Sequence, residues 1–155
     1  MAGQADVFLA VIDDTSECDK ALRYASLRAM RTGASVMLLR VLAPAQFQQW
    51  GGVQHVIEEE LELDAQALLA EKALLAETWT GMRPETRLLW GDGPQKILEI
   101  LTSERAIRAL VLAAAAKGRP GPLVEFFAGE RAGRLPCMVI VVPGSMSDAE
   151  LDRLT

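Results

Sequence analysis

The chain contains little of what disulfide bonding, metal binding or membrane insertion requires. Its 155 residues include two cysteines and one histidine, and the two cysteines give neither a disulfide framework nor a metal-ligand pair. Residues 1–6 show no basic segment leading into an apolar core, so we expect no secretion signal. No apolar run approaches the roughly 20 residues of a membrane-spanning helix. We therefore expect a cytoplasmic protein with reduced thiols and no membrane partner.

Clusters of basic residues are missing as well. The net charge is −5, and lysine and arginine do not gather in any segment, so nucleic acid is not an expected partner. The hydrophobic and charged fractions, 50% and 24%, are ordinary for a globular protein. We expect a single domain over residues 1–155, with a core at about 6–143 and a short helical tail at 145–155.

Several short segments are apolar at almost every position, which is typical of strands buried on both faces of a parallel sheet. These segments are residues 7–12, 35–42, 110–114 and 138–142. A more mixed segment, 86–90, predicts a further strand near an edge of the sheet. Helical patterns separate the strands, at residues 16–32, 53–80, from Pro94 onward, and 123–135.

Local signals mark the ends of these helices. Ser16 and Asp19 have the spacing of a capping box, and Gly33 is a typical C-terminal stop. Ser147 and Glu150 predict a second capping box, which opens a final turn with Leu151 and Leu154 as its apolar contacts. In the long helix the expected core face comprises Ile57, Leu61, Ala65, Leu68, Leu75 and Trp79.

The regular alternation of strands and helices predicts the fold class. It favours an α/β protein with five parallel strands and right-handed crossovers, a doubly wound three-layer α/β/α sandwich. Ligands of such sheets bind beyond the carboxyl ends of the strands. The turn from Gly118 to Gly121 follows the strand at 110–114 and would lie there.

Four segments resemble the universal stress protein family. Residues 10–15 (Ala-Val-Ile-Asp-Asp-Thr) are similar to that family's opening strand and acidic turn, and 91–98 to its Gly-Asp-Pro segment. Residues 118–121 resemble the start of its phosphate loop, and 136–142 its final strand. The similarity covers about residues 6 to 143. It implies the adenine-nucleotide alpha-hydrolase-like variant of the fold.

The resemblance also implies a ligand site. In ATP-binding members an aspartate after the first strand and a backbone position ending the second hold the adenosine, and a Gly-x2-Gly-x9-Gly-Ser/Thr loop wraps the phosphates. The corresponding residues here are Asp13, Val41, Gly118 and Gly121, with ATP or AMP as the candidate cofactor.

The second half of the phosphate loop departs from the family pattern. Arg131 stands where the next glycine is expected, and aligning backwards from the last strand puts Glu125 near the phosphates. A shortened loop would instead use Gly129 and Glu130. A carboxylate repels a triphosphate. ATP is therefore disfavoured relative to AMP, adenosine or another small ligand, and a plain turn without ligand is the remaining alternative.

Other chemical functions have weaker support. Asp13 and Asp14 are also compatible with a magnesium-binding receiver domain, but the second predicted strand ends without an acid and only Lys117 matches its lysine. His55 has no catalytic partner nearby in sequence, and Cys18 has no evident base. Asp14, Thr15 and Ser16 are expected to cap the first helix.

The resemblance implies a non-enzymatic stress-response protein that forms homodimers. The segment from Met138 to Val142 has no internal charge or proline, so as an edge strand it could pair with its copy. The alternative is a nucleotide-binding switch with slow ATP hydrolysis. Extraction of bound nucleotide from the purified protein would distinguish the two.

Overall fold

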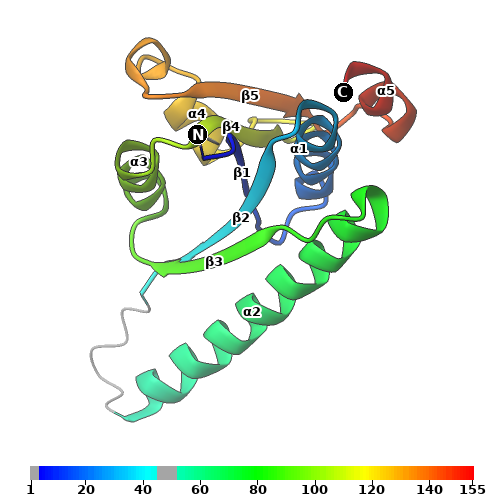
Figure 1. Ribbon diagram of the computed structural model, residues 1–155. Helices are drawn as coiled ribbons and strands as arrows, with labels where there is room; N and C mark the ends of the chain where they lie inside the picture. Colours follow the sequence, from blue (N-terminus) through cyan, green and yellow to red (C-terminus); the bar gives the residue numbers. More distant parts are fainter. Residues whose placement is uncertain (1–3, 45–51) are drawn as a thin grey trace.

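A central sheet of five parallel strands organises the chain. The computed structural model describes residues 4–44 and 52–155. The strands follow the order β3-β2-β1-β4-β5, so β3 and β5 form the two edges (Figure 1). Their bounds are β1 Val7–Val11, β2 Ser35–Leu42, β3 Glu85–Trp90, β4 Ile107–Ala114 and β5 Met138–Pro143. The predicted five-stranded parallel sheet is confirmed.

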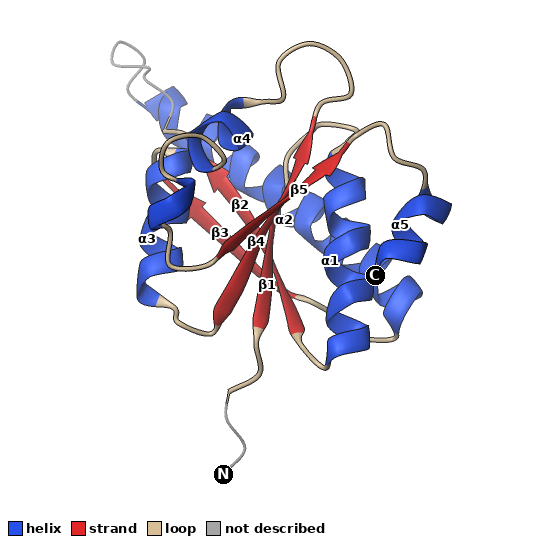
Figure 2. Ribbon diagram, turned by 90° about the horizontal axis from the view of Figure 1, so that it is seen from above, coloured by secondary structure: helices blue, strands red, loops and turns tan. Residues whose placement is uncertain are grey.

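Helices cover both faces of this sheet, which completes the expected three layers (Figure 2). One apolar core lies between the sheet and α1, α2 and α5, and a second lies between the sheet and α3 and α4. The helices are α1 Cys18–Thr32, α2 Gly52–Thr80, α3 Gly93–Ser103, α4 Pro122–Phe127 and α5 Asp148–Leu154, with a short 3₁₀ turn at Ala132–Arg134.

The strand order decides between two interpretations of the sequence. From β1 the chain proceeds outward through β2 to β3, then crosses back to place β4 on the other side of β1. The switch point, where ligands bind in doubly wound sheets, therefore lies between β1 and β4. Receiver domains have the order 2-1-3-4-5 instead. The receiver-domain alternative for Asp13, Asp14 and Lys117 is wrong for this reason.

Some predicted helix ends agree with the structure. Gly33 ends α1 at φ 76° and its N–H bonds to the Ala29 carbonyl. Asp92 accepts from the Gln95 N–H at the start of α3, and the Ser147–Glu150 capping box of α5 is present. The box predicted at Ser16 is absent: α1 starts at Cys18, and its N-cap residue makes no side-chain capping bond.

Other helix ends and buried helix faces differ from those that the sequence predicts. The buried residues of α2 are Ala65, Leu69, Ala73 and Ala76, so the core stripe is rotated from the predicted one, and Leu61 is exposed. The predicted helix at 123–135 ends at Phe127 because the chain turns at Gly129. Leu151 is buried as expected, whereas Leu154 is exposed. Between β2 and α2 the Pro44 and Gly51-Gly52 signals of the sequence predict a loop at 43–52, and most of it lies outside the described residues.

Candidate functional site

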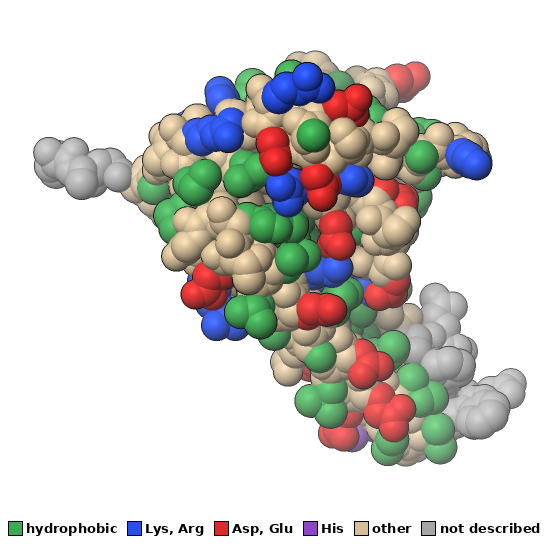
Figure 3. Space-filling model, turned by 90° about the vertical axis from the view of Figure 1, so that its right-hand side faces the viewer, with side chains coloured by type: hydrophobic (Ala, Val, Ile, Leu, Met, Phe, Trp, Pro, Cys, Tyr) green, Lys and Arg blue, Asp and Glu red, His purple; other side chains and the backbone are tan. Residues whose placement is uncertain are grey.

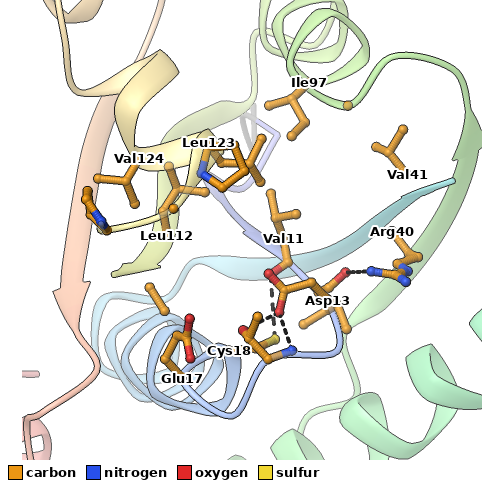
Figure 4. A pocket seen from close by; sticks show the side chains of 17 residues that line it. Val11, Asp13, Glu17, Cys18, Arg40, Val41, Ile97, Leu112, Leu123 and Val124 are labelled. Atoms are coloured by element: carbon orange, nitrogen blue, oxygen red, sulfur yellow. Dashed lines mark hydrogen bonds between the residues drawn. The ribbon is translucent and has the colours of Figure 1, made fainter. Parts of the chain in front are cut away.

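A cavity of about 270 Å³ opens at the switch point, beyond the carboxyl ends of β1, β2 and β4 (Figure 4). Its apolar lining comes from the strand residues Val11, Val41 and Leu112 and from Leu123 at the start of α4. The turn that leads into α1 and the first turns of α3 and α4 complete the wall. The cavity is therefore mostly apolar, with a few polar groups at its rim, as small-ligand sites commonly are.

Asp13 lies at this rim, immediately after β1. Its Oδ1 atom accepts hydrogen bonds from the Thr15 N–H, at 2.9 Å, and from the Thr15 hydroxyl. These two bonds hold the carboxylate in a tight turn at the mouth of the cavity. Asp13 is thus positioned by its own loop, which leaves its other oxygen to a ligand hydroxyl or amino group.

Arg40 supplies a positive charge to the same wall. Its Nη1 donates to the Ile12 carbonyl at 3.4 Å and its Nη2 to Asp14 Oδ2 at 3.1 Å, while its buried Nε has no partner in the described part of the chain. The sequence signal for Arg40 was present, because it is the single charged residue within an otherwise apolar strand.

Cys18 lines the cavity from the first turn of α1. Its thiol contacts the Val11 carbonyl at 3.7 Å and is 2% exposed. Burial raises the pKa of the Cys18 thiol to about 11, against a weaker lowering by a backbone hydrogen bond at Asp13. A thiol with this pKa stays protonated at neutral pH, as expected for a packed and inert cysteine.

The two glycines of the predicted phosphate loop occupy different places. Gly121 lines the cavity together with Asp13 and Val41, whereas Gly118 is exposed in the turn and is not part of the cavity lining. Gly121 adopts φ 119° and ψ 154°, a conformation that residues with a Cβ rarely adopt. The structure therefore brings three of the four predicted site residues together.

The loop beyond Gly121 is closed by its own side chains. Arg119 forms an ion pair with Glu125, and the Arg131 guanidinium lies over the Phe126 ring, 4.1 Å from its centroid. Pro122, the first residue of α4, has no N–H to offer a phosphate. This side of the cavity thus provides few of the backbone donors that hold a triphosphate chain.

The remaining candidates lie elsewhere. His55 is exposed on α2, and its Nε2 lies 3.0 Å from Glu59. Cys137 precedes β5, and burial raises the pKa of its thiol. Within residues 4–44 and 52–155, no cluster of three potential ligands could hold a metal ion. In the same residues, none of the helices has the length and hydropathy needed to traverse a bilayer.

Solved structures share this architecture over nearly the whole chain. The universal stress protein UspA from Lactobacillus plantarum is similar with a TM-score of 0.73 and 17% identity, over 91% of this chain and 99% of that one. A universal stress protein in complex with cAMP gives a TM-score of 0.64 at 16% identity, over 92% of this chain and 100% of that chain.

The universal stress protein from Archaeoglobus fulgidus in complex with dAMP gives a TM-score of 0.61 at 15% identity, over 89% of this chain and 97% of that one. At these identities the likeness shows the fold. A search of curated protein sequences finds no significant match. The family model described as "Universal stress protein family" matches residues 5–143, nearly the whole domain, so the chain belongs to the universal stress protein family.

Proposed function

We propose that this chain is a non-enzymatic stress-response protein that binds adenosine or AMP in the cavity at the switch point. The observation that carries the proposal is that Asp13, Val41 and Gly121 all line one cavity. These residues come from three separate segments. The family resemblance implies that Asp13 and Val41 hold the adenosine and that Gly121 belongs to the phosphate loop. Solved relatives in complex with cAMP and dAMP support this ligand class.

The size and lining of the cavity favour a nucleoside or monophosphate over ATP. The cavity volume of about 270 Å³ lies just below the usual range of small-ligand sites, which begins at roughly 300 Å³. Apolar strand residues suit a purine ring, and the Asp13 carboxylate suits hydroxyl groups of a ribose. Towards the expected phosphates the chain presents Pro122 and the Arg119–Glu125 pair instead of a row of free N–H groups.

Catalysis is not part of the proposal. The charged residues that line the cavity are Asp13, Glu17 and Arg40, and Arg40 is already bonded to Ile12 and Asp14. The Cys18 thiol beside them is held neutral by burial. The Thr15 hydroxyl also lines the cavity, and its hydrogen bond to Asp13 holds that carboxylate in the turn, so this set serves to orient a ligand.

Direct binding measurements test the proposal. Calorimetric titration should detect AMP or adenosine, with ATP and magnesium binding more weakly. Asp13→Asn should weaken AMP binding by roughly tenfold, the loss of one charge-assisted hydrogen bond of about 1.5 kcal/mol. Asp14→Asn is the matched control, because Asp14 is exposed and points to Arg40 at the rim. Unchanged AMP binding in Asp13→Asn would contradict the proposed site. Tight ATP binding with hydrolysis would favour the alternative of an ATP-dependent switch.

We further propose that the protein forms homodimers through β5. This strand is an edge of the sheet, and it contains no charged residue between Met138 and Pro143. The opposite edge, β3, carries Glu85 and Arg87, which discourage strand pairing. Met138 is 63% exposed at the start of β5. A second copy of the chain, related by a two-fold axis beside β5, would cover this apolar edge.

A further inference from the structure

A second apolar stripe runs along the solvent-facing side of α2. The side of α2 that faces the sheet and α1 buries Ala65, Leu69, Ala73 and Ala76. On the opposite side, apolar residues recur at alternating intervals of three and four, interrupted only at Glu60. We define this α2 stripe as Val53, Val56, Leu63, Ala67, Ala70 and Leu74. The spacing is that of the a and d positions of a heptad, the pattern by which one helix receives another.

The stripe is open to solvent. Leu63 is 65% exposed, Leu74 56% and Val56 52%, among the largest values for apolar side chains in the described chain. The first half of α2 projects beyond the sheet (Figure 1). A surface helix of a single domain normally has one apolar face, which it turns to the core. An apolar stripe on the second side indicates a surface that is used in binding.

Acidic side chains accompany the stripe along its length. Glu59, Asp64 and Glu71 lie beside it and are exposed, and Glu60 lies within it. The lone lysine of α2, Lys72, is turned to the other side, where its Nζ lies 2.7 Å from Asp19. Figure 3 shows acidic and hydrophobic side chains interspersed on the projecting lower part of the molecule. A second copy docked here would oppose carboxylates to carboxylates, which disfavours self-pairing.

We propose that the α2 stripe binds an amphipathic helix of a partner protein, one that carries lysine or arginine on both flanks of its apolar face. Residues 53–74 offer about 33 Å of helix, or three heptads. The small residues Ala67 and Ala70 let the backbone of the partner helix approach α2 closely. Val56 and Leu63 insert between side chains of the partner helix. This surface shares no residue with the cavity, so the inference does not depend on nucleotide binding.

A designed peptide tests the proposal on the full-length protein. The probe is a three-heptad helical peptide with leucine at a and d and lysine at e and g, whose lysines prevent it from pairing with itself. The matched peptide has glutamate at e and g. Fluorescence anisotropy should show binding of the lysine peptide, weakening as salt rises, and no binding of the glutamate peptide. Equal binding of both peptides, or of neither, would overturn the proposal.

Variants locate the binding surface. Leu63→Gln should lower the affinity for the lysine peptide by about tenfold or more, because it removes a central apolar contact of the interface. Leu154→Gln on α5, an equally exposed leucine, should have no effect. Glu71→Gln should weaken binding several-fold and reduce its salt dependence, while Glu99→Gln on α3 should not. Because Leu63 is exposed, its variant should keep the parent's thermal unfolding, and Ala67→Glu provides a second disruption.

The alternative occupant of the α2 stripe is a second copy of this chain, and the oligomeric state tests it. In sedimentation equilibrium Leu63→Gln should leave the oligomeric state unchanged, since the dimer proposed above uses β5. Dissociation of the protein on Leu63→Gln would assign the α2 stripe to a second copy and overturn the basic-helix proposal. Unchanged peptide affinity in both Leu63→Gln and Ala67→Glu would do the same.

Discussion

The Arg119 guanidinium and the Glu125 carboxylate form a two-point ion pair, with Nε to Oε1 and Nη2 to Oε2 both at 2.8 Å. The pair spans the turn between β4 and α4, where the family resemblance places nucleotide phosphates. The Glu125 carboxylate repels the phosphates of a nucleotide. Its ion pair also occupies the Arg119 guanidinium, which would otherwise be available to bind a phosphate. One substitution relative to the phosphate-loop pattern thus removes a favourable group and adds an unfavourable one.

Removal of that carboxylate should therefore improve triphosphate binding. Glu125→Gln frees Arg119 and eliminates the repulsion, and we expect ATP affinity to rise several-fold relative to adenosine, on the order of 1 kcal/mol at this exposed position. Calorimetric titration with both ligands measures the ratio. Glu130→Gln is the control, because the two residues represent two alignments of the loop. A larger gain from Glu130→Gln would show that the shortened alignment is the correct one.

The two glycines of the turn should differ in what their replacement changes. Gly121 holds φ 119° and ψ 154° at the cavity wall, so Gly121→Ala should cost about 1–3 kcal/mol of unfolding free energy and weaken AMP binding. Gly118 has φ 76° with open space around it and no place in the cavity lining. Gly118→Ala should cost about 1–2 kcal/mol and leave AMP binding intact. Urea unfolding and calorimetry test both; loss of AMP binding in the Gly118 variant would place the ligand in the turn itself.

The buried thiol of Cys18 predicts a stability change at alkaline pH. Its pKa is raised from 9.0 to about 11 in the folded protein, chiefly by burial. Between these values the unfolded chain has lost the proton and the folded chain has kept it, so the free energy of unfolding falls as pH rises from 9 to about 11. Cys18→Ala should remove this part of the slope. Urea unfolding at several pH values measures the difference, and identical slopes would contradict the assignment.

The proposed β5 dimer predicts a change in molecular mass. Ile140→Lys should give monomers in sedimentation experiments, because a charge on the edge strand opposes pairing. Since Ile140 is half-buried, Met138→Lys at the exposed end provides a second variant with less risk to folding. Circular dichroism checks that both fold. Dimers that persist in both variants would place the interface elsewhere.

Much of the fold follows from local sequence patterns. The segments 7–12 and 35–42 have an apolar residue at nearly every position, a pattern typical of strands within a helix-covered parallel sheet. Residues 138–142 have the same pattern, but they form the edge strand β5, in which only Val142 is buried. Gly33 and the Ser147–Glu150 box mark helix ends by backbone chemistry that acts within a few residues. The box predicted at Ser16 is wrong because α1 begins at Cys18, so Ser16 lies one residue before the N-cap position, which Glu17 occupies.

The candidate site could be anticipated only in part. Asp13 and Val41 were reached by resemblance, and Gly121 by its place after a strand. Arg40 was missed because an arginine in a strand can point to solvent, to an edge or into a cavity, and only the neighbouring strands decide which. The exposure of the α2 stripe was likewise hidden, since both sides of that helix are apolar at helical spacing.

The alternation of strands and helices follows from local sequence alone, because hydrophobic periodicity and capping act over short distances. Long-range packing sets the strand order β3-β2-β1-β4-β5, the face of α2 that is buried, and the assembly of one cavity from three distant segments. Those outcomes depend on contacts between residues far apart in the chain, and a local pattern carries no information about which distant segment it will meet.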